Sequence, residues 1–251
     1  MSLADLAKRV DLRLEFLDPT WFRGKRVLDI GCNSALLTVF IALHYKPKKI
    51  QGVDIDPSLI GKAQNFVTNI DDDNDNEEGE GANQEDLPYE EYFPRAMYRI
   101  HGLLPVPERT SRTEVLFPHN IELRVADWVT ETDNHQDAEA EQWDIIFAFS
   151  LTKWVHLHHG DAGLKRFFQK IYRSLAKGGI LLLEPQAYET YNRRSKILPE
   201  MQTTYKEIAF RPEMFQEYLL GPEVGFREGR LLGHSEGRAR NFNRDIYMYR
   251  K

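Results

Sequence analysis

Cysteine is nearly absent from this 251-residue chain, and long apolar runs are missing altogether. The one cysteine, Cys32, has no second thiol with which to form an internal disulfide, which is typical of cytosolic and nuclear proteins. No apolar run reaches the roughly 20 residues that a membrane-spanning helix needs. Residues 1–16 contain no continuous apolar stretch of the kind found in a secretory signal. We therefore expect neither a membrane-spanning segment nor a secretory signal.

Basic residues are missing from residues 71–91, which hold eleven acidic residues. When this segment is left out, the net charge of the chain changes from −6 to +5. A mildly basic folded part suits an anionic ligand such as RNA. A net charge of this size is also common among proteins that bind no anion. Because the segment is acidic and nearly free of apolar residues, we predict a disordered insert at about residues 71–92. It lies within a longer excursion that ends near residue 113.

The rest of the chain alternates between apolar, strand-like runs and segments with helical spacing. This alternation predicts a single α/β domain over residues 1–251, with a mostly parallel sheet and helices on both of its faces. In such a sheet, a ligand binds at the carboxyl ends of the strands, where the strand order reverses. The predicted strands are 26–32, 49–55, 120–128, 143–150, 180–186 and an edge strand at 244–250; the predicted helices are 34–44, 57–70, 163–176, 191–205 and 211–221.

The turn after the first predicted strand lacks the three glycines of a dinucleotide-binding loop. Only Gly31 is present, with Asn33 and Ser34 in the next places, so the loop is not built for two phosphates. Asp29, at the end of the strand, can hold an ammonium group by a charge-assisted hydrogen bond, although a turn aspartate is the alternative. Cys32 is interpreted as a packing residue. The loop favours a small ligand that carries a sulfonium and an ammonium.

Acidic residues also end the second and third predicted strands. Asp54 can accept hydrogen bonds from both hydroxyls of a ribose, and Ile55 follows it. Asp127 can accept from an adenine amino group, and Trp128 can cover the adenine ring by stacking. The alternatives are that Asp54 caps a helix and that Trp128 is a core aromatic. The predicted S-adenosylmethionine site comprises Asp29, Gly31, Asn33, Asp54, Ile55, Asp127, Trp128 and Ser150.

The segment after the fourth predicted strand, residues 150–161, is dense in hydrogen-bond donors. Ser150, Thr152 and Lys153 can hold an anion, and we predict them as the catalytic group. Trp154 can stack on a base or wall the pocket. His156 is one of three histidines here, but metal ligands converge from separated positions and no second Cys or His pair completes a site. We therefore predict no metal.

Four blocks of the sequence resemble the bicoid-interacting-type RNA methyltransferases, a family that includes the methylphosphate capping enzymes of small noncoding RNAs. The blocks are VLDIGCNSALLT, GVDID, LFPHNIELRVADW and the run from LTKWVHL to LEPQ, and the resemblance covers about residues 20–251. It implies a Rossmann-like class I methyltransferase with a seven-stranded sheet, acting as a monomer in the nucleus, with the cytoplasm as an alternative.

The same resemblance implies methyl transfer from S-adenosylmethionine to an oxygen of the RNA 5′ γ-phosphate, with ribonucleoprotein proteins as further partners. A phosphate oxygen already carries negative charge near neutral pH, since its second pKa is about 6, so this nucleophile needs no general base. The predicted RNA-binding residues are Lys153, Trp154, His156, Arg193, Arg194 and Lys196. For the last three, the alternative is a solvated basic helix face.

The chain departs from the family at its start, because the usual arm of the type G-N-Y-x-x-Y-Y is not found before the core. Three alternatives therefore stay open. The acceptor is a 5′-monophosphate; or the chain is an RNA-binding scaffold of a small ribonucleoprotein with weak or lost activity; or it methylates a small molecule or a protein.

Overall fold

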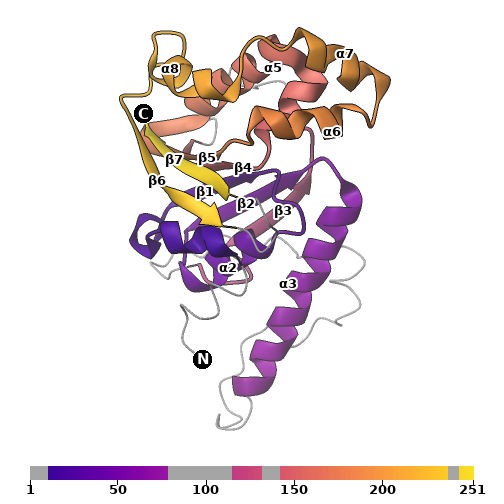
Figure 1. Ribbon diagram of the computed structural model, residues 1–251. Helices are drawn as coiled ribbons and strands as arrows, with labels where there is room; N and C mark the ends of the chain where they lie inside the picture. The colour runs from indigo at the N-terminus through magenta and orange to yellow at the C-terminus, as the bar shows by residue number, and fades with distance from the viewer. Residues whose placement is uncertain (1–10, 79–114, 132–141, 237–242) are drawn as a thin grey trace.

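The computed structural model describes residues 11–78, 115–131, 142–236 and 243–251 (Figure 1). Seven strands form one sheet in the order β3-β2-β1-β4-β5-β7-β6. The strands are β1 (Arg26–Ile30), β2 (Lys49–Asp54), β3 (Ile121–Val125), β4 (Trp143–Phe149), β5 (Leu175–Glu184), β6 (Glu228–Glu236) and β7 (Asn243–Arg250). The helices are α2 (Leu36–His44), α3 (Pro57–Glu78), α5 (Thr152–Ser174), α6 (Tyr191–Ser195), α7 (Pro199–Glu207) and α8 (Phe215–Leu220), with the short 3-10 helices η1 (Leu12–Phe16), η2 (Pro19–Trp21), η4 (Tyr188–Thr190) and η5 (Pro212–Met214). Within these residues, no helix is long and apolar enough to cross a membrane.

The sheet is mixed, with a parallel part of five strands. Strands β3, β2, β1, β4 and β5 pair in parallel, whereas β7 pairs antiparallel with both β5 and β6. The chain adds β2 and β3 on one side of β1 and β4 on the other, so the strand order reverses between β1 and β4. A sheet of this kind binds ligands at this switch point.

Two apolar cores lie on opposite faces of the sheet. Along β4, Ile145 and Phe147 belong to the core that includes α2, whereas Ile146 and Ala148 belong to the core that includes α5 and α8. This is the two-residue period of a β-strand. Helices therefore cover both faces, as predicted (Figure 1).

The C-terminal edge of the sheet differs from the prediction. The strand predicted at the edge, β7, is internal, and the unpredicted strand β6 forms the edge. The sequence of β6 lacks a clean alternation, and Gly233 interrupts it. A Cβ at Gly233 would come within 2.2 Å of the Phe16 ring, so the packing of η1 against β6 explains the glycine that hid this strand.

The helices also differ from the prediction at their ends. Helix α3 continues from Ile70 to Glu78, because each residue added to an existing helix gains a backbone hydrogen bond; the remaining residues of the predicted disordered insert lie outside the described residues. Helix α5 begins at Thr152 rather than Gly163 and breaks at Gly160, which has a φ of 64°. The single helix predicted at 191–205 is two helices, since the residue before Pro199 is extended.

Candidate active site

The loop after β1 is a tight turn. Gly31 has a φ of 75°, and Asn33 has a φ of 55°. The N–H of Gly31 donates to the carbonyl of Val53 over 2.8 Å, which ties the loop to β2. A Cβ at position 31 would lie 3.1 Å from Cδ1 of Leu151, just before α5. Glycine adopts a positive φ without strain, so Gly31 serves both the turn and its close approach to α5.

The carboxylate of Asp54 is fixed at the end of β2, across from this loop. Its Oδ2 accepts the N–H of Asn33 over 2.9 Å, and its Oδ1 accepts the N–H of Asp56 over 3.0 Å. The cap of α3 is Asp56, whose Oδ1 accepts the N–H of Ser58 over 2.8 Å, so Asp54 is not the helix cap. Beside it, Ile55 leaves 67% of its surface exposed, which is unusual for an isoleucine at the edge of a core. The predicted residues Asn33, Asp54 and Ile55 therefore lie together.

Asp29 lies buried at the carboxyl end of β1. Its Oδ2 accepts the hydroxyl of Thr38 over 2.6 Å. Burial raises the pKa of Asp29 to about 6, against the opposing effects of the Thr38 hydrogen bond and the Arg13 charge. The carboxylate is therefore predominantly ionised at pH 7 and attracts a cation.

Asp127 and Trp128 follow β3, but the structure gives both of them local roles. The Asp127 carboxylate accepts the hydroxyl of Thr130 over 2.6 Å and the N–H of Val129 over 3.1 Å, as a turn cap does. Trp128 is only 7% exposed and packs edge-on against Phe167. Lys170 Nζ lies 4.4 Å from the centroid of the Trp128 ring. The prediction that Trp128 covers an adenine is wrong for this arrangement, because helix α5 already covers its ring.

Gln186 organises the start of α5. Its Oε1 accepts the hydroxyl of Thr152 over 2.9 Å and the N–H of Lys153 over 3.0 Å, while its Nε2 donates to the carbonyl of Ser150. Thr152 is fully buried, so its hydroxyl anchors the helix, and its prediction as a catalytic residue is corrected. Ser150 has a φ of 56° and accepts a hydrogen bond from Arg244 at its Oγ.

Lys153 lies at the centre of a cluster of positive charges. Its Nζ is 3.4 Å from the hydroxyl of Thr190. Burial, together with the charges of Arg244, Arg194 and Arg193, lowers the pKa of Lys153 to about 8. Four cationic side chains from three distant parts of the chain therefore converge here, which is the arrangement that binds a polyanion.

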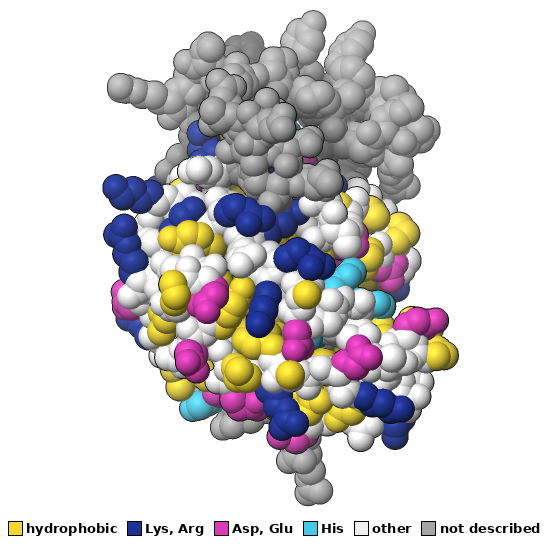
Figure 2. All heavy atoms as spheres, turned by 90° about the horizontal axis from the view of Figure 1, so that it is seen from above, with side chains coloured by type: hydrophobic (Ala, Val, Ile, Leu, Met, Phe, Trp, Pro, Cys, Tyr) yellow, Lys and Arg dark blue, Asp and Glu magenta, His cyan; other side chains and the backbone are white. Residues whose placement is uncertain are grey.

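The predicted basic group after β5 is exposed. Arg193, Arg194 and Lys196 lie at the surface of α6 and just after it, and the face that carries α5 to α8 shows several Lys and Arg side chains near one another (Figure 2). The Arg194 guanidinium is 5.6 Å from the centroid of the Trp154 ring, and Lys153 Nζ is 5.8 Å from it. Trp154 is half-buried, so its ring is within reach of both the exposed Arg194 and Lys153.

His156 was predicted to bind RNA, but it is a core residue. It is fully buried, with its Nε2 2.8 Å from Oδ1 of Asp161 and with the rings of Tyr191 and Phe210 around it. Burial lowers the pKa of His156. Asp161 in turn accepts the backbone N–H of Phe210 over 2.9 Å, so this pair holds the chain before η5 onto α5. The prediction is corrected: a surface role needs an exposed ring.

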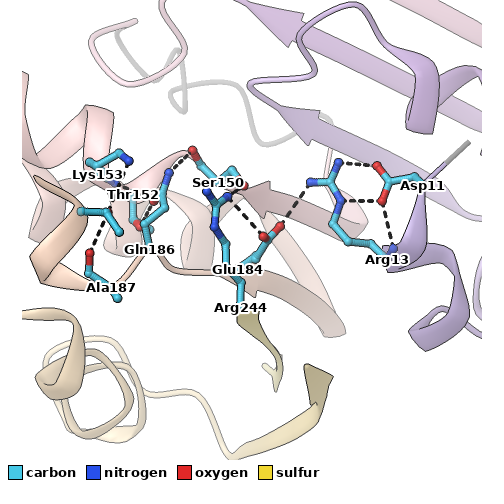
Figure 3. A network of polar contacts seen from close by, with 10 residues as sticks. Asp11, Arg13, Ser150, Thr152, Lys153, Glu184, Gln186, Ala187 and Arg244 are labelled. Carbon is cyan, nitrogen blue, oxygen red and sulfur yellow. Dashed lines mark hydrogen bonds and ion pairs between the residues drawn. The ribbon is translucent and has the colours of Figure 1, made fainter. Parts of the chain in front are cut away.

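A buried carboxylate, Glu184, joins two arginines at the end of β5 (Figure 3). Its Oε2 lies 3.2 Å from Nη1 of Arg13, and its Oε1 lies 3.4 Å from Nη1 of Arg244. Arg13 also pairs with Asp11 and lies 5.0 Å over the Phe149 ring. Burial raises the pKa of Glu184, and the two arginines oppose that shift. The network connects the Asp29 side of the site with the Lys153 side.

Comparison with known proteins identifies the family. The profile of Bicoid-interacting protein 3 (Bin3) matches residues 143–251. The chain is 36% identical over 243 residues to the U6 snRNA methylphosphate capping enzyme Amus of Drosophila melanogaster, covering 96% of this chain and 68% of that protein. This chain belongs to the Bin3 family. It is also 35% identical to the 7SK snRNA methylphosphate capping enzyme of Mus musculus, over 96% of this chain but only 38% of that protein's length.

More distant relatives of this Bin3-family chain extend the comparison. The RNA 5'-monophosphate methyltransferase of Mus musculus is 24% identical over 76% of this chain and 57% of that protein. Among solved structures, the N-methyltransferase NodS from Bradyrhizobium japonicum, in complex with S-adenosyl-l-homocysteine, matches with a TM-score of 0.52 and 12% identity, over 95% of this chain and 85% of that one. At this identity the likeness shows the fold alone, which is the Rossmann-like methyltransferase fold.

Within this Bin3-family chain, sequence reasoning missed Arg13, Glu184 and Gln186. Glu184 left a readable signal, since it is the one charged residue in the apolar run of residues 180–184. A carboxylate buried at the end of a strand needs a charged partner, so this signal could have been used to expect basic residues near Glu184. Arg13 left no such signal, because it reaches the site from a short 3-10 helix 171 residues away in the chain.

Proposed function

We propose that this chain methylates the 5′ γ-phosphate of a small noncoding RNA, with S-adenosylmethionine as the methyl donor. The observation that supports this most is the convergence of Arg193, Arg194 and Arg244 on Lys153, at the carboxyl ends of β4 and β5. The acidic ends of β1 and β2 lie next to them in the sheet. The likeness to capping enzymes of 7SK and U6 snRNA supports an RNA 5′ end as the partner and the nucleus as the site of action.

The ends of β1 and β2 suit a cationic cofactor. Asp54 would accept the ribose hydroxyls, the exposed Ile55 side chain would cover one face of the adenine, and Asp29 would attract the ammonium. Gly31 has no side chain at the point where the loop comes closest to α5, which leaves the loop backbone accessible to a ligand. S-adenosylmethionine supplies a methyl group bonded to a positively charged sulfur.

The acceptor half suits a nucleophile that needs no general base. A phosphate oxygen is anionic near pH 7, since its second pKa is about 6. In agreement with this, His156 pairs with Asp161 inside the core and is not available as a base. Lys153 and the arginines would neutralise the phosphates and align one oxygen with the methyl group, and such positioning and charge stabilisation are sufficient for this chemistry.

The direct test uses one RNA sequence with three 5′ ends: triphosphate, monophosphate and hydroxyl. Each RNA is incubated with labelled S-adenosylmethionine, with the Lys153→Ala variant in parallel. We expect label on the triphosphate end, and a strong loss of label in the variant. Label on the hydroxyl end would contradict a phosphate acceptor, and tight RNA binding without label would indicate a scaffold.

A 5′-monophosphate acceptor is the second candidate. The 24% identical RNA 5'-monophosphate methyltransferase of Mus musculus favours it. Label on the monophosphate end in place of the triphosphate end, in the same experiment, would establish this candidate.

A further inference from the structure

Arg244 reaches the acceptor half from the far side of β5. The pairing of β7 with β5 ends at Tyr247, opposite Leu183, and at Arg244 the backbone pairs with Ser235 of β6. Nevertheless, Nη1 of Arg244 donates to Oγ of Ser150 at the end of β4. Because β5 lies between β4 and β7, the two strands are about 10 Å apart. The Arg244 side chain therefore spans β5, and fixing so flexible a side chain costs rotamer freedom.

Glu184, the last residue of β5, supports this side chain midway. It is fully buried, and its Oε1 lies 3.4 Å from Nη1 of Arg244. The backbone N–H of Ser150 donates to the carbonyl of Glu184 over 3.1 Å, so the residue that Arg244 reaches is tied to the residue that supports it. Because Glu184 is buried, it does not contact a ligand itself. Any effect that it has on the reaction passes through its partners.

The carboxylate of Glu184 is held from its other side by Arg13 (Figure 3). Oε2 of Glu184 lies 3.2 Å from Nη1 of Arg13. Arg13 is fixed in turn, since its Nε donates to Oδ1 of Asp11 over 2.9 Å and its guanidinium lies 5.0 Å over the ring of Phe149. Each oxygen of Glu184 thus has its own arginine, and a rotation of the carboxylate would break at least one of the two ion pairs.

We infer that Glu184 is a positioning residue for methyl transfer, which holds the Arg244 guanidinium at the end of β4. This inference rests on the function proposed above, in which Lys153 and the arginines align a phosphate oxygen with the methyl group. Loss of the Glu184 charge would make the cluster more positive, and added positive charge strengthens RNA binding. A loosely held Arg244 would instead lose the alignment on which the rate depends. Charge balance and positioning therefore predict different results.

The test compares Glu184→Gln with the control Glu228→Gln. Glu228 is exposed and pairs with Arg250 over 3.7 Å, at the far end of β7 from Arg244. Single-turnover methyl transfer gives the rate, and calorimetry gives the affinities for 5′-triphosphate RNA and for S-adenosylmethionine. In Glu184→Gln we expect the rate to fall about 10-fold to 100-fold, as for the loss of a hydrogen bond to a charged group, while RNA affinity is equal or higher. Glu228→Gln should leave the rate unchanged.

Arg244→Lys, alone and combined with Glu184→Gln, tests whether Glu184 acts through Arg244. Lysine keeps the charge but lacks the planar fork of arginine, so Arg244→Lys should also lower the rate. If both residues act through one contact, the double variant should be no slower than the slower single variant. Losses that multiply would overturn the inference, and so would an unchanged rate in Glu184→Gln. If Glu184→Gln does not fold, Glu184→Asp makes the same comparison, because its shorter side chain keeps the charge but does not reach both arginines.

A measurement without turnover separates this inference from the proposed function. In NMR spectra of 15N-labelled arginine side chains, the Nη signals are resolved when a guanidinium is held and averaged when it rotates. We expect resolved signals for Arg244 in the unmodified protein and in Glu228→Gln, and averaged signals in Glu184→Gln. An Arg244 that stays held in Glu184→Gln would overturn the inference, with or without methyl transfer. If Arg244 is released but even the unmodified protein methylates no RNA, the positioning of Arg244 by Glu184 stands and the proposed function fails.

Discussion

The two halves of the candidate site are held by contacts of very different range along the chain. In the cofactor half, Asp54 is fixed by Asp56 two residues away and by Asn33 21 residues away. In the acceptor half, Glu184 is held by Arg13 171 residues away and by Arg244 60 residues away. The position of Asp54 therefore needs only β1, β2 and their turns, whereas the position of Glu184 needs segments near both ends of the chain packed onto the sheet.

This difference has a consequence for how the halves respond to change. Backbone N–H groups hold the Asp54 carboxylate of the cofactor half, and arginine side chains hold the Glu184 carboxylate of the acceptor half (Figure 3). Removing one member of a buried side-chain network costs more stability than removing an isolated contact, because the remaining partners stay buried without their hydrogen bonds. Single substitutions should therefore separate cofactor binding from RNA binding.

The largest effect is expected for Asp54→Ala. Both ribose hydroxyls lose an ionised acceptor, and hydrogen bonds to charged groups contribute about 1.5–3 kcal/mol each, so the affinity for S-adenosylmethionine should fall by more than about 100-fold. RNA affinity should change little, and calorimetry with each ligand measures both. Asp56→Ala is the control: it removes the cap of α3 and should lower stability by about 1 kcal/mol without altering cofactor affinity. Undiminished cofactor binding by Asp54→Ala would refute the site.

Lys153→Ala tests the other half. Loss of one charged contact to phosphate should lower kcat/KM for 5′-phosphorylated RNA by about 10-fold to 100-fold, while cofactor affinity stays the same. The matched control is Lys177→Ala, an exposed lysine near the start of β5, at the opposite end of the strand from the site. An equal loss of kcat/KM in both variants would mean that the effect comes from the overall charge of the protein and not from a defined phosphate site.

The pH dependence should also differ between the halves. Since burial lowers the pKa of Lys153 to about 8, the free protein loses this charge as pH rises through about 8, and kcat/KM for RNA should fall there. Lys153→Arg stays charged, so its kcat/KM should not fall over that range. On the acid side, burial raises the pKa of Asp29 to about 6, so cofactor affinity should fall below about pH 6. Identical alkaline limbs for the protein and for Lys153→Arg would assign the fall to another group.

Sequence reasoning succeeded where a residue's role depends on its neighbours in the chain. Gly31, Asn33 and Asp54 follow strands that are evident from their apolar runs, and the structure brings these residues together. It failed where the role depends on what packs over a residue. Trp128 was predicted to end the third strand, but β3 ends at Val125. Lys170 and Phe167 from α5 cover the Trp128 ring, and no local pattern reveals that contact.

The same distinction explains the errors after β4. His156 looked like a surface donor because the helix was predicted to begin at Gly163. With α5 beginning at Thr152, His156 lies on the buried face of the helix, against Tyr191. A helix start shifted by three turns changes which side chains reach the surface. The role of Lys153 stays a prediction, and this error does not affect it, because the charges of Arg193, Arg194 and Arg244 reach Lys153 from elsewhere in the chain.

The smallest effect, and the one that tests where the halves meet, is expected for Gly31→Ala. A non-glycine residue at positive φ costs about 1–2 kcal/mol. Gly24→Ala should show this backbone strain and no steric clash, because Gly24 has a φ of 69° and a Cβ there would meet nothing within 4 Å. At Gly31 the new Cβ would also lie 3.1 Å from Leu151, which immediately precedes α5. Displacement of Leu151 should reach Lys153, so Gly31→Ala should lower both cofactor affinity and RNA kcat/KM by a few-fold, whereas Gly24→Ala changes only the urea midpoint. If Gly31→Ala weakens cofactor binding alone, the two halves are independent at their point of contact.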